Sequence, residues 1–174
     1  MYGGAKAVFY FLSRSRTLKS LASTYGMRTP DSFARRFIAG HSVDDAIAVA
    51  RTLAGRGLSV TLDYLGESVR SFDEAAAAAQ QYVRVIDAIV AAGVERNISL
   101  KLTQLGAGVD RATSLDNLRR ILDRAERDGV FVWIDMENSP WTDLTLETLD
   151  KAWSLGHRRL GVALQAALRR SEDD

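Results

Sequence analysis

Short apolar segments alternate with amphipathic helical segments from residue 58 onward. The apolar segments have the length and composition of strands, and they cover residues 58–63, 97–105, 130–135 and 160–165. Each helix predicted between them begins at a capping residue, namely Ser71, Ser114 or Thr142. Each helix ends at a glycine, namely Gly93, Gly129 or Gly156. This alternation predicts right-handed βαβ units and a parallel sheet.

The two faces of the predicted strands differ in character. In the segment 97–105, aliphatic Ile98 and Leu100 share one face, while Ser99 and Lys101 share the other. The first and fourth strands show the same division, and the third has bulky residues in line with Asp135. An aliphatic outer face and a small or polar inner face are typical of a barrel. A doubly wound sheet stays open as an alternative, although no Gly-rich phosphate loop follows the first strand.

We therefore predict an α/β fold, a partial (β/α)8 TIM-type barrel with about four βα units, preceded by N-terminal helices. Residues 1–40 form the predicted N-terminal helical segment and residues 41–174 the half-barrel. Residues 1–57 carry nine Lys and Arg against three acids, which indicates either solvated helix faces or weak attraction to an anionic membrane surface. The expected location is cytoplasmic, with peripheral contact at the inner membrane face as an option.

The composition narrows the chemistry. The chain has no cysteine, which excludes disulfides, thiolate nucleophiles and zinc-thiolate sites. Its two histidines, His41 and His157, make a histidine-based metal site improbable, and we interpret both as surface residues. The net charge of +1 favours no nucleic acid partner.

Charged and amide side chains stand at or near the ends of successive predicted strands, at Asp63, Lys101, Asp135 and Gln165. In a barrel, the carboxyl ends of the strands carry the chemistry. A lysine between two carboxylates is physically sensible, because the opposite charges stabilise one another. The alternatives are a buried ion-pair network without a catalytic role, and a lysine that forms a Schiff base. Glu137 and Arg169 fit a role in the site and a role as solvated loop-end charges equally well.

Four segments stand at successive predicted strand ends, namely Leu62–Glu67, Lys101–Gly106, Ile134–Glu137 and Leu164–Arg170. Together and in this order they resemble the proline dehydrogenase family, which oxidises L-proline with a flavin. Each motif is weak by itself, and the four in register are strong. The resemblance runs from about Phe37 to Arg170.

The resemblance implies a (β/α)8 barrel that holds FAD, transfers a hydride from L-proline to it, releases 1-pyrroline-5-carboxylate and passes electrons to a quinone. It implies that Asp135, Lys101 and Asp63 form the catalytic site and that Lys101 and Asp63 also bind the substrate. It also implies that Met136 contacts FAD through its main chain and that Gln165 binds the isoalloxazine ring. A hydride transfer needs this anchoring, because the reacting carbon must be held against the flavin.

Two departures from the family pattern qualify this expectation. Ala167 stands where the family usually carries an aromatic residue, and the chain has 174 residues where a (β/α)8 barrel has around 250. The final residues after Arg170 are expected to start a helix capped by Ser171. We therefore expect a chain that is catalytically incomplete by itself. The alternative is a non-catalytic half-barrel that forms a homodimer or pairs with a separate C-terminal half.

Overall fold

The computed structural model describes residues 38–174, so the helical segment predicted for residues 1–40 lies almost entirely outside the described residues. The chain divides into two compact units, Met1–Ala46 and Ile47–Asp174. Helix α3 (Val43–Ala54) starts after Ser42, whose hydroxyl accepts a hydrogen bond from the Asp45 backbone N–H. The Asp45 carboxylate accepts in return from the Ser42 N–H, which completes a reciprocal cap.

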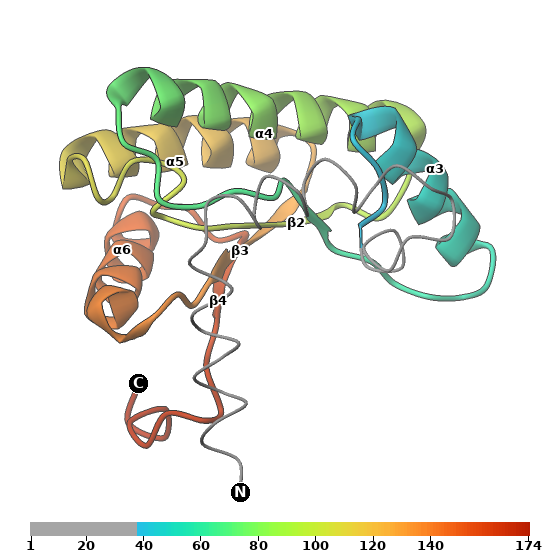
Figure 1. The fold of residues 1–174 in the computed structure, drawn as a ribbon. Coiled ribbons are helices and arrows are strands. Elements are labelled where there is room, and N and C mark those ends of the chain that lie inside the picture. The colour runs from blue at the N-terminus through green and yellow to red at the C-terminus, as the bar shows by residue number, and fades with distance from the viewer. Residues whose placement is uncertain (1–37) are drawn as a thin grey trace, which may run out of the picture. The chain divides into compact units, whose positions relative to one another are not determined.

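The second unit contains a four-stranded parallel sheet (Figure 1). Its strands are β1 (Leu62–Asp63), β2 (Asn97–Leu100), β3 (Phe131–Asp135) and β4 (Leu160–Ala163), and they pair in chain order. The crossovers contain α4 (Phe72–Ala92), α5 (Arg111–Arg127), and the 3-10 turn η2 (Ser139–Trp141) followed by α6 (Thr142–Ser154). Sequential parallel neighbours joined by helices are the arrangement of consecutive strands in a (β/α) barrel, so the predicted fold class is confirmed.

One of the three helices between the strands starts at the predicted capping residue, and two do not. Helix α4 follows Ser71, whose hydroxyl accepts from the Glu74 N–H, and Gly93 ends it at a φ of 64°. The prediction for α5 was wrong, since Asp110 caps it and Ser114 lies inside, donating its hydroxyl to the Leu102 carbonyl. The predicted cap at Thr142 was also wrong, because η2 leads directly into α6 and leaves no N-terminal side-chain cap.

The strands are shorter than their apolar segments. Strand β2 ends at Leu100, and the rest of the predicted segment 97–105 folds into buried turns, with the Leu105 N–H donating to the Leu102 carbonyl. Leu102 and Leu105 are as buried as the strand residues. An apolar run therefore marked burial correctly but did not distinguish a strand from a turn.

The helix-facing side of the sheet forms the core. The pairing of Leu62 with Ile98, of Ile98 with Val132 and of Val132 with Leu160 places these residues in one row. Helices α4 and α5 pack against each other over this side (Figure 1). The core comprises fully buried aliphatic residues from both layers, among them Ile86, Ile89, Ile98, Leu100, Leu118, Ile121, Leu122, Val132 and Ile134.

The opposite face of the sheet is half-buried and carries the other residues of each strand. One row contains Asp63, Ser99, Trp133 and Gly161. The Phe131 and Trp133 rings lie 4.6 Å apart between centroids, which confirms that the third strand is bulky on this side. A Cβ atom at Gly161 would lie 2.6 Å from Trp133 Cζ3, so only glycine leaves room for this ring.

Two predictions outside the site were wrong. His157 is buried and not a surface residue, and its Nδ1 lies 3.1 Å from Glu126 Oε1. The segment after Arg170 forms turns, and the Ser171 hydroxyl donates to the Gln165 carbonyl and does not cap a helix. Among the described residues, no helix is both long and apolar enough to cross a bilayer.

Substituting Gly161 tests the close packing of Trp133 against β4 on the inner face of the sheet. We expect Gly161→Ala to lower the free energy of unfolding by about 1–3 kcal/mol, because the added methyl overlaps the Trp133 ring. Urea unfolding measures the loss. Gly55→Ala is the control, since its Cβ would meet only ordinary contacts at 3.5 Å or more. Equal stability of the two variants would contradict the close packing of Trp133 on β4.

Candidate active site

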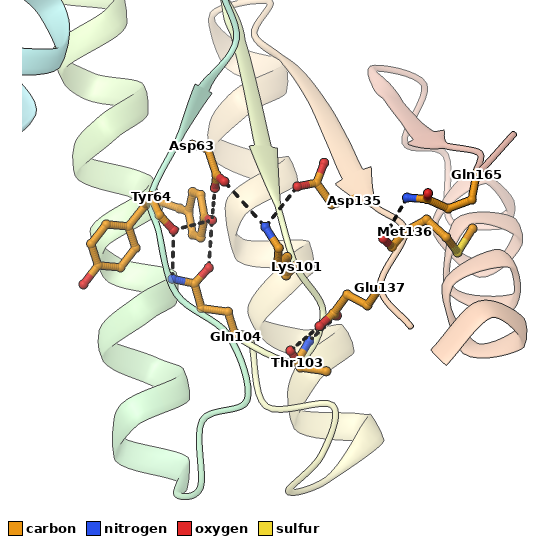
Figure 2. Close-up of polar contacts among 10 residues, drawn as sticks. Asp63, Tyr64, Lys101, Thr103, Gln104, Asp135, Met136, Glu137 and Gln165 are labelled. Carbon is orange, nitrogen blue, oxygen red and sulfur yellow. Dashed lines mark hydrogen bonds and ion pairs between the residues drawn. The ribbon is translucent and has the colours of Figure 1, made fainter. Parts of the chain in front are cut away.

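Lys101 lies between two carboxylates at the carboxyl ends of the strands (Figure 2). Its Nζ is 3.1 Å from Asp135 Oδ2 and 3.6 Å from Asp63 Oδ2. The side chains of Lys101, Asp63 and Asp135 are 24%, 24% and 31% exposed, so all three retain access to solvent or a ligand. The predicted trio therefore forms one cluster.

The strand register brings this cluster together. Leu100 pairs with Ile134, so Lys101 and Asp135 leave the sheet side by side. Asp63 pairs with Ser99, which lies two residues before Lys101 on the same face of β2. Since alternate residues of a strand point to the same side, all three charged groups meet above the inner face.

Burial and charge act in opposite directions on these groups. Burial raises the pKa of the Asp63 carboxyl, and this outweighs the lowering by the nearby Lys101 ammonium. Burial lowers the pKa of Lys101, but the hydrogen bond to Asp135 and the charges of both carboxylates raise it more, so its pKa is above the usual value. Lys101 is therefore a cation at neutral pH. This disfavours the Schiff-base alternative, which needs a neutral amine.

A hydrogen-bonded group stands behind Asp63 and was not predicted. The Tyr82 hydroxyl, from the middle of α4, lies 3.3 Å from Asp63 Oδ1, 2.9 Å from Gln104 Oε1 and 3.2 Å from the Tyr64 carbonyl. The Gln104 amide donates to that same carbonyl at 3.0 Å. These contacts join α4, the end of β1 and the turn after β2.

A second group connects three loops. Glu137 accepts hydrogen bonds from the Thr103 backbone N–H, at 3.0 Å, and from the Thr103 hydroxyl (Figure 2). The Thr103 hydroxyl also accepts from the Ser68 N–H at 3.0 Å, and Ser68 has a φ of 55°. Of the two alternatives left open for Glu137, the solvated charge is therefore excluded, because the carboxylate fixes the turn after β2 against the loop after β3.

The two predicted cofactor residues lie next to each other. The Gln165 side-chain amide donates to the Met136 carbonyl at 3.4 Å, and Figure 2 shows both at the far side of Asp135 from Lys101. The Met136 side chain is buried, whereas Gln165 is exposed. The backbone after β3 and the amide after β4 thus form an accessible polar edge beside the charged cluster.

The sequence predicted the charged residues of this site but not the hydrogen-bonded residues that hold them in place. Tyr82 continues the apolar stripe of Ile86 and Ile89, so the sequence indicated that its ring is buried. A buried tyrosine hydroxyl needs a hydrogen-bond partner, and this could have pointed to a polar contact of Tyr82. Gln104 and Thr103 stand directly after Lys101 within a recognised motif, but nothing in the sequence indicated which groups they contact.

The family model for proline dehydrogenase matches residues 46–174. The chain belongs to the proline dehydrogenase family. It is 36% identical over 167 residues to proline dehydrogenase 1 of Bacillus subtilis, covering 96% of this chain and 54% of that protein. It is 35% identical over 147 residues to the proline dehydrogenase of Deinococcus radiodurans, covering 82% and 47%. The chain thus spans about half the length of these relatives.

Solved structures agree with the family. Proline utilization A from Bdellovibrio bacteriovorus, inactivated by N-propargylglycine, superposes with a TM-score of 0.73 at 26% identity. The match covers 80% of this chain and 18% of that one. A proline utilization A mutant from Bradyrhizobium japonicum gives a TM-score of 0.64 at 20% identity over 90% and 18%, which supports the fold.

The raised pKa of Asp63 predicts a pH dependence of stability. A carboxyl whose pKa is higher in the folded state stabilises the fold when protonated. This contribution is complete below the unfolded pKa of 3.8 and is lost as the pH rises through the folded value. Relative to Asp63→Asn, the wild type should therefore lose unfolding free energy as the pH rises above 3.8.

Urea unfolding at a series of pH values measures this difference. Asp150→Asn, at an exposed position on α6, is the control for the loss of one negative charge. A wild type that gains unfolding free energy relative to Asp63→Asn as the pH rises would contradict the assigned direction.

Proposed function

We propose that this chain carries the substrate-anchoring part of a proline dehydrogenase, which oxidises L-proline to 1-pyrroline-5-carboxylate by hydride transfer to FAD. The observation that carries the proposal is the Lys101 ammonium held by Asp63 and Asp135 at the strand ends of a chain in this family. The half-barrel assigned to residues 41–174 provides this site, with the segment 1–40 preceding it.

In this proposal Lys101 orients the proline substrate. An ammonium has three N–H donors, and the two carboxylates face two of them. The remaining donor can bind one carboxylate oxygen of proline. Because Lys101 and its partners are already held in place by the strand register, binding costs little further ordering. Asp135, on the side toward Met136, then lies between the substrate anchor and the cofactor edge.

The described residues fit the flavin ring at the edge formed by Met136 and Gln165. The Gln165 side chain is exposed and can turn its amide toward a ring nitrogen or oxygen, while the backbone at Met136 offers main-chain contacts. When bound, FAD supplies the two-electron acceptor that no amino acid side chain provides. The quinone as the next acceptor, and peripheral contact with the inner membrane face from the cytoplasm, are parts of the same proposal.

The second candidate function is a non-catalytic half-barrel that pairs with another chain. In the described sheet, β1 and β4 each pair on one side, and the inner face with Phe131 and Trp133 is half-buried. Edges and faces of this kind can be covered by a second copy or by a complementary C-terminal half. A homodimer without flavin would favour this candidate.

Expressing the chain with flavin available distinguishes the two. Flavin absorbance in the purified protein together with proline-dependent dye reduction supports the enzyme. Colourless, inactive protein that becomes active with the C-terminal half of a relative supports an enzyme assembled from two parts. Colourless protein that stays inactive with that half contradicts the proposed function.

In the active form, Lys101→Met and Asp135→Asn should each lower kcat/KM for proline by about 100-fold or more, because the substrate loses its anchor or its orientation. Steady-state dye reduction measures this loss. Lys151→Met and Asp150→Asn remove the same charges from exposed positions on α6 and are the matched controls. Near-normal rates in Lys101→Met would exclude Lys101 from substrate binding.

A further inference from the structure

Tyr82 places a single proton among three oxygen acceptors. Its side chain is fully buried, and its hydroxyl reaches Gln104 Oε1, the Tyr64 carbonyl and Asp63 Oδ1 within 2.9–3.3 Å. A hydroxyl donates one hydrogen bond, so at any moment two of these acceptors are not served by Tyr82. Burial, and then the charge of Asp63, raise the pKa of Tyr82 above its usual range, so it remains a donor.

The three acceptors are not equivalent. The Tyr64 carbonyl already accepts from the Gln104 amide at 3.0 Å. That bond fixes the orientation of Gln104, because the reversed amide would set two oxygens against each other. The Tyr82 proton is therefore shared chiefly between Gln104 Oε1 and Asp63 Oδ1. Gln104 has the shorter distance, whereas an ionised carboxylate is the stronger acceptor.

The two oxygens of Asp63 have different partners. Oδ1 faces Tyr82 on α4, and Oδ2 faces the Lys101 ammonium at the end of β2. Tyr82 thus contacts the carboxylate oxygen that does not face Lys101. The Tyr82 and Tyr64 rings meet edge to face at 5.9 Å, which fixes the approach of the hydroxyl.

Gln104 is held in place as firmly as Tyr82. Its side chain is buried, and a Cβ at Gly66 would lie 2.5 Å from Gln104 Nε2. The backbone of the loop after β1 therefore packs directly on the Gln104 amide. As a result, the acceptor that competes for the Tyr82 proton cannot move away without displacing that loop.

We propose that Tyr82 is a positioning residue for the substrate anchor: its hydroxyl holds the Asp63 carboxylate toward Lys101, and Gln104 competes for the same proton. This rests on the proposed function and deepens it, because a residue of α4 then stabilises the ionised form of Asp63. The titratable groups acting on Asp63 are Lys101 and Asp135 from the strand ends and Tyr82 from α4. Of these, only Tyr82 is neutral, so it stabilises the carboxylate without adding a charge to the cluster.

The titration midpoint of Asp63 tests the proposal without substrate or cofactor. It can be read by carbon NMR of the full chain labelled at the aspartate carboxyl carbons, with the signal assigned by its loss in Asp63→Asn. Tyr82→Phe should shift the midpoint upward, since the carboxylate loses a donor. Mere loosening of the packing predicts the opposite shift, because better hydration lowers the pKa of a buried carboxyl. A fall or no change in Tyr82→Phe would overturn the proposal.

Two further variants complete the experiment. Tyr64→Phe removes an exposed hydroxyl and keeps both the ring and the carbonyl, so the midpoint should not move. Gln104→Met removes both the competing acceptor and the amide donor of the Tyr64 carbonyl, so that carbonyl and Asp63 then share the Tyr82 proton. Because an ionised carboxylate is the stronger acceptor of the two, the midpoint should still fall. A rise or no change in Gln104→Met overturns the proposal even if Tyr82→Phe does not fold. Since none of these readings uses proline or flavin, a failure of the proposed enzyme activity remains a separate result.

Discussion

The ion pairs of Lys101 are the interaction on which the site depends. A half-buried ammonium needs opposite charges close by, and the sheet supplies them from its two neighbouring strands. This works only in one register, because a shift of one residue would turn Asp135 or Asp63 to the helix side of the sheet. Burial of Ile98, Val132 and Leu160 on the helix side of the sheet fixes that register. The core and the site are therefore specified by the same alternation.

Behind the ion pairs lie two hydrogen-bonded groups with different tasks. Glu137 and Thr103 connect loops, and they hold the turn after β2 between the loops after β1 and β3. Tyr82 and Gln104 act on a charged group directly. Both groups rely on the buried turn that follows Leu100. That turn takes Thr103 and Gln104 out of the strand and away from its inner face, where a continuous strand would have placed Thr103.

The sequence predicted the parts of the molecule that local patterns determine. Alternation within strands gave the correct face for Lys101 and Asp135, and glycine and serine gave both ends of α4. It did not predict that Asp110 would replace Ser114 as a cap, because both residues suit that position, and the hydrogen bond of the Ser114 hydroxyl to the distant Leu102 carbonyl is not visible in the sequence. Nor did it predict the contact of Tyr82 with Asp63, since 19 residues and a loop of unknown path separate them.

The charged cluster also lowers the stability of the fold, and this loss helps to explain its arrangement. The raised pKa of Asp63 means that its ionised form opposes folding, although Lys101 is near. A chain shaped by stability alone could place a neutral residue there, and Asp135 alone would still pair with Lys101 at 3.1 Å. The second carboxylate, with a tyrosine donor beside it, therefore fits the proposed substrate anchor better than a purely structural role. It keeps an opposite charge on a second side of the ammonium, 3.6 Å from Lys101 Nζ.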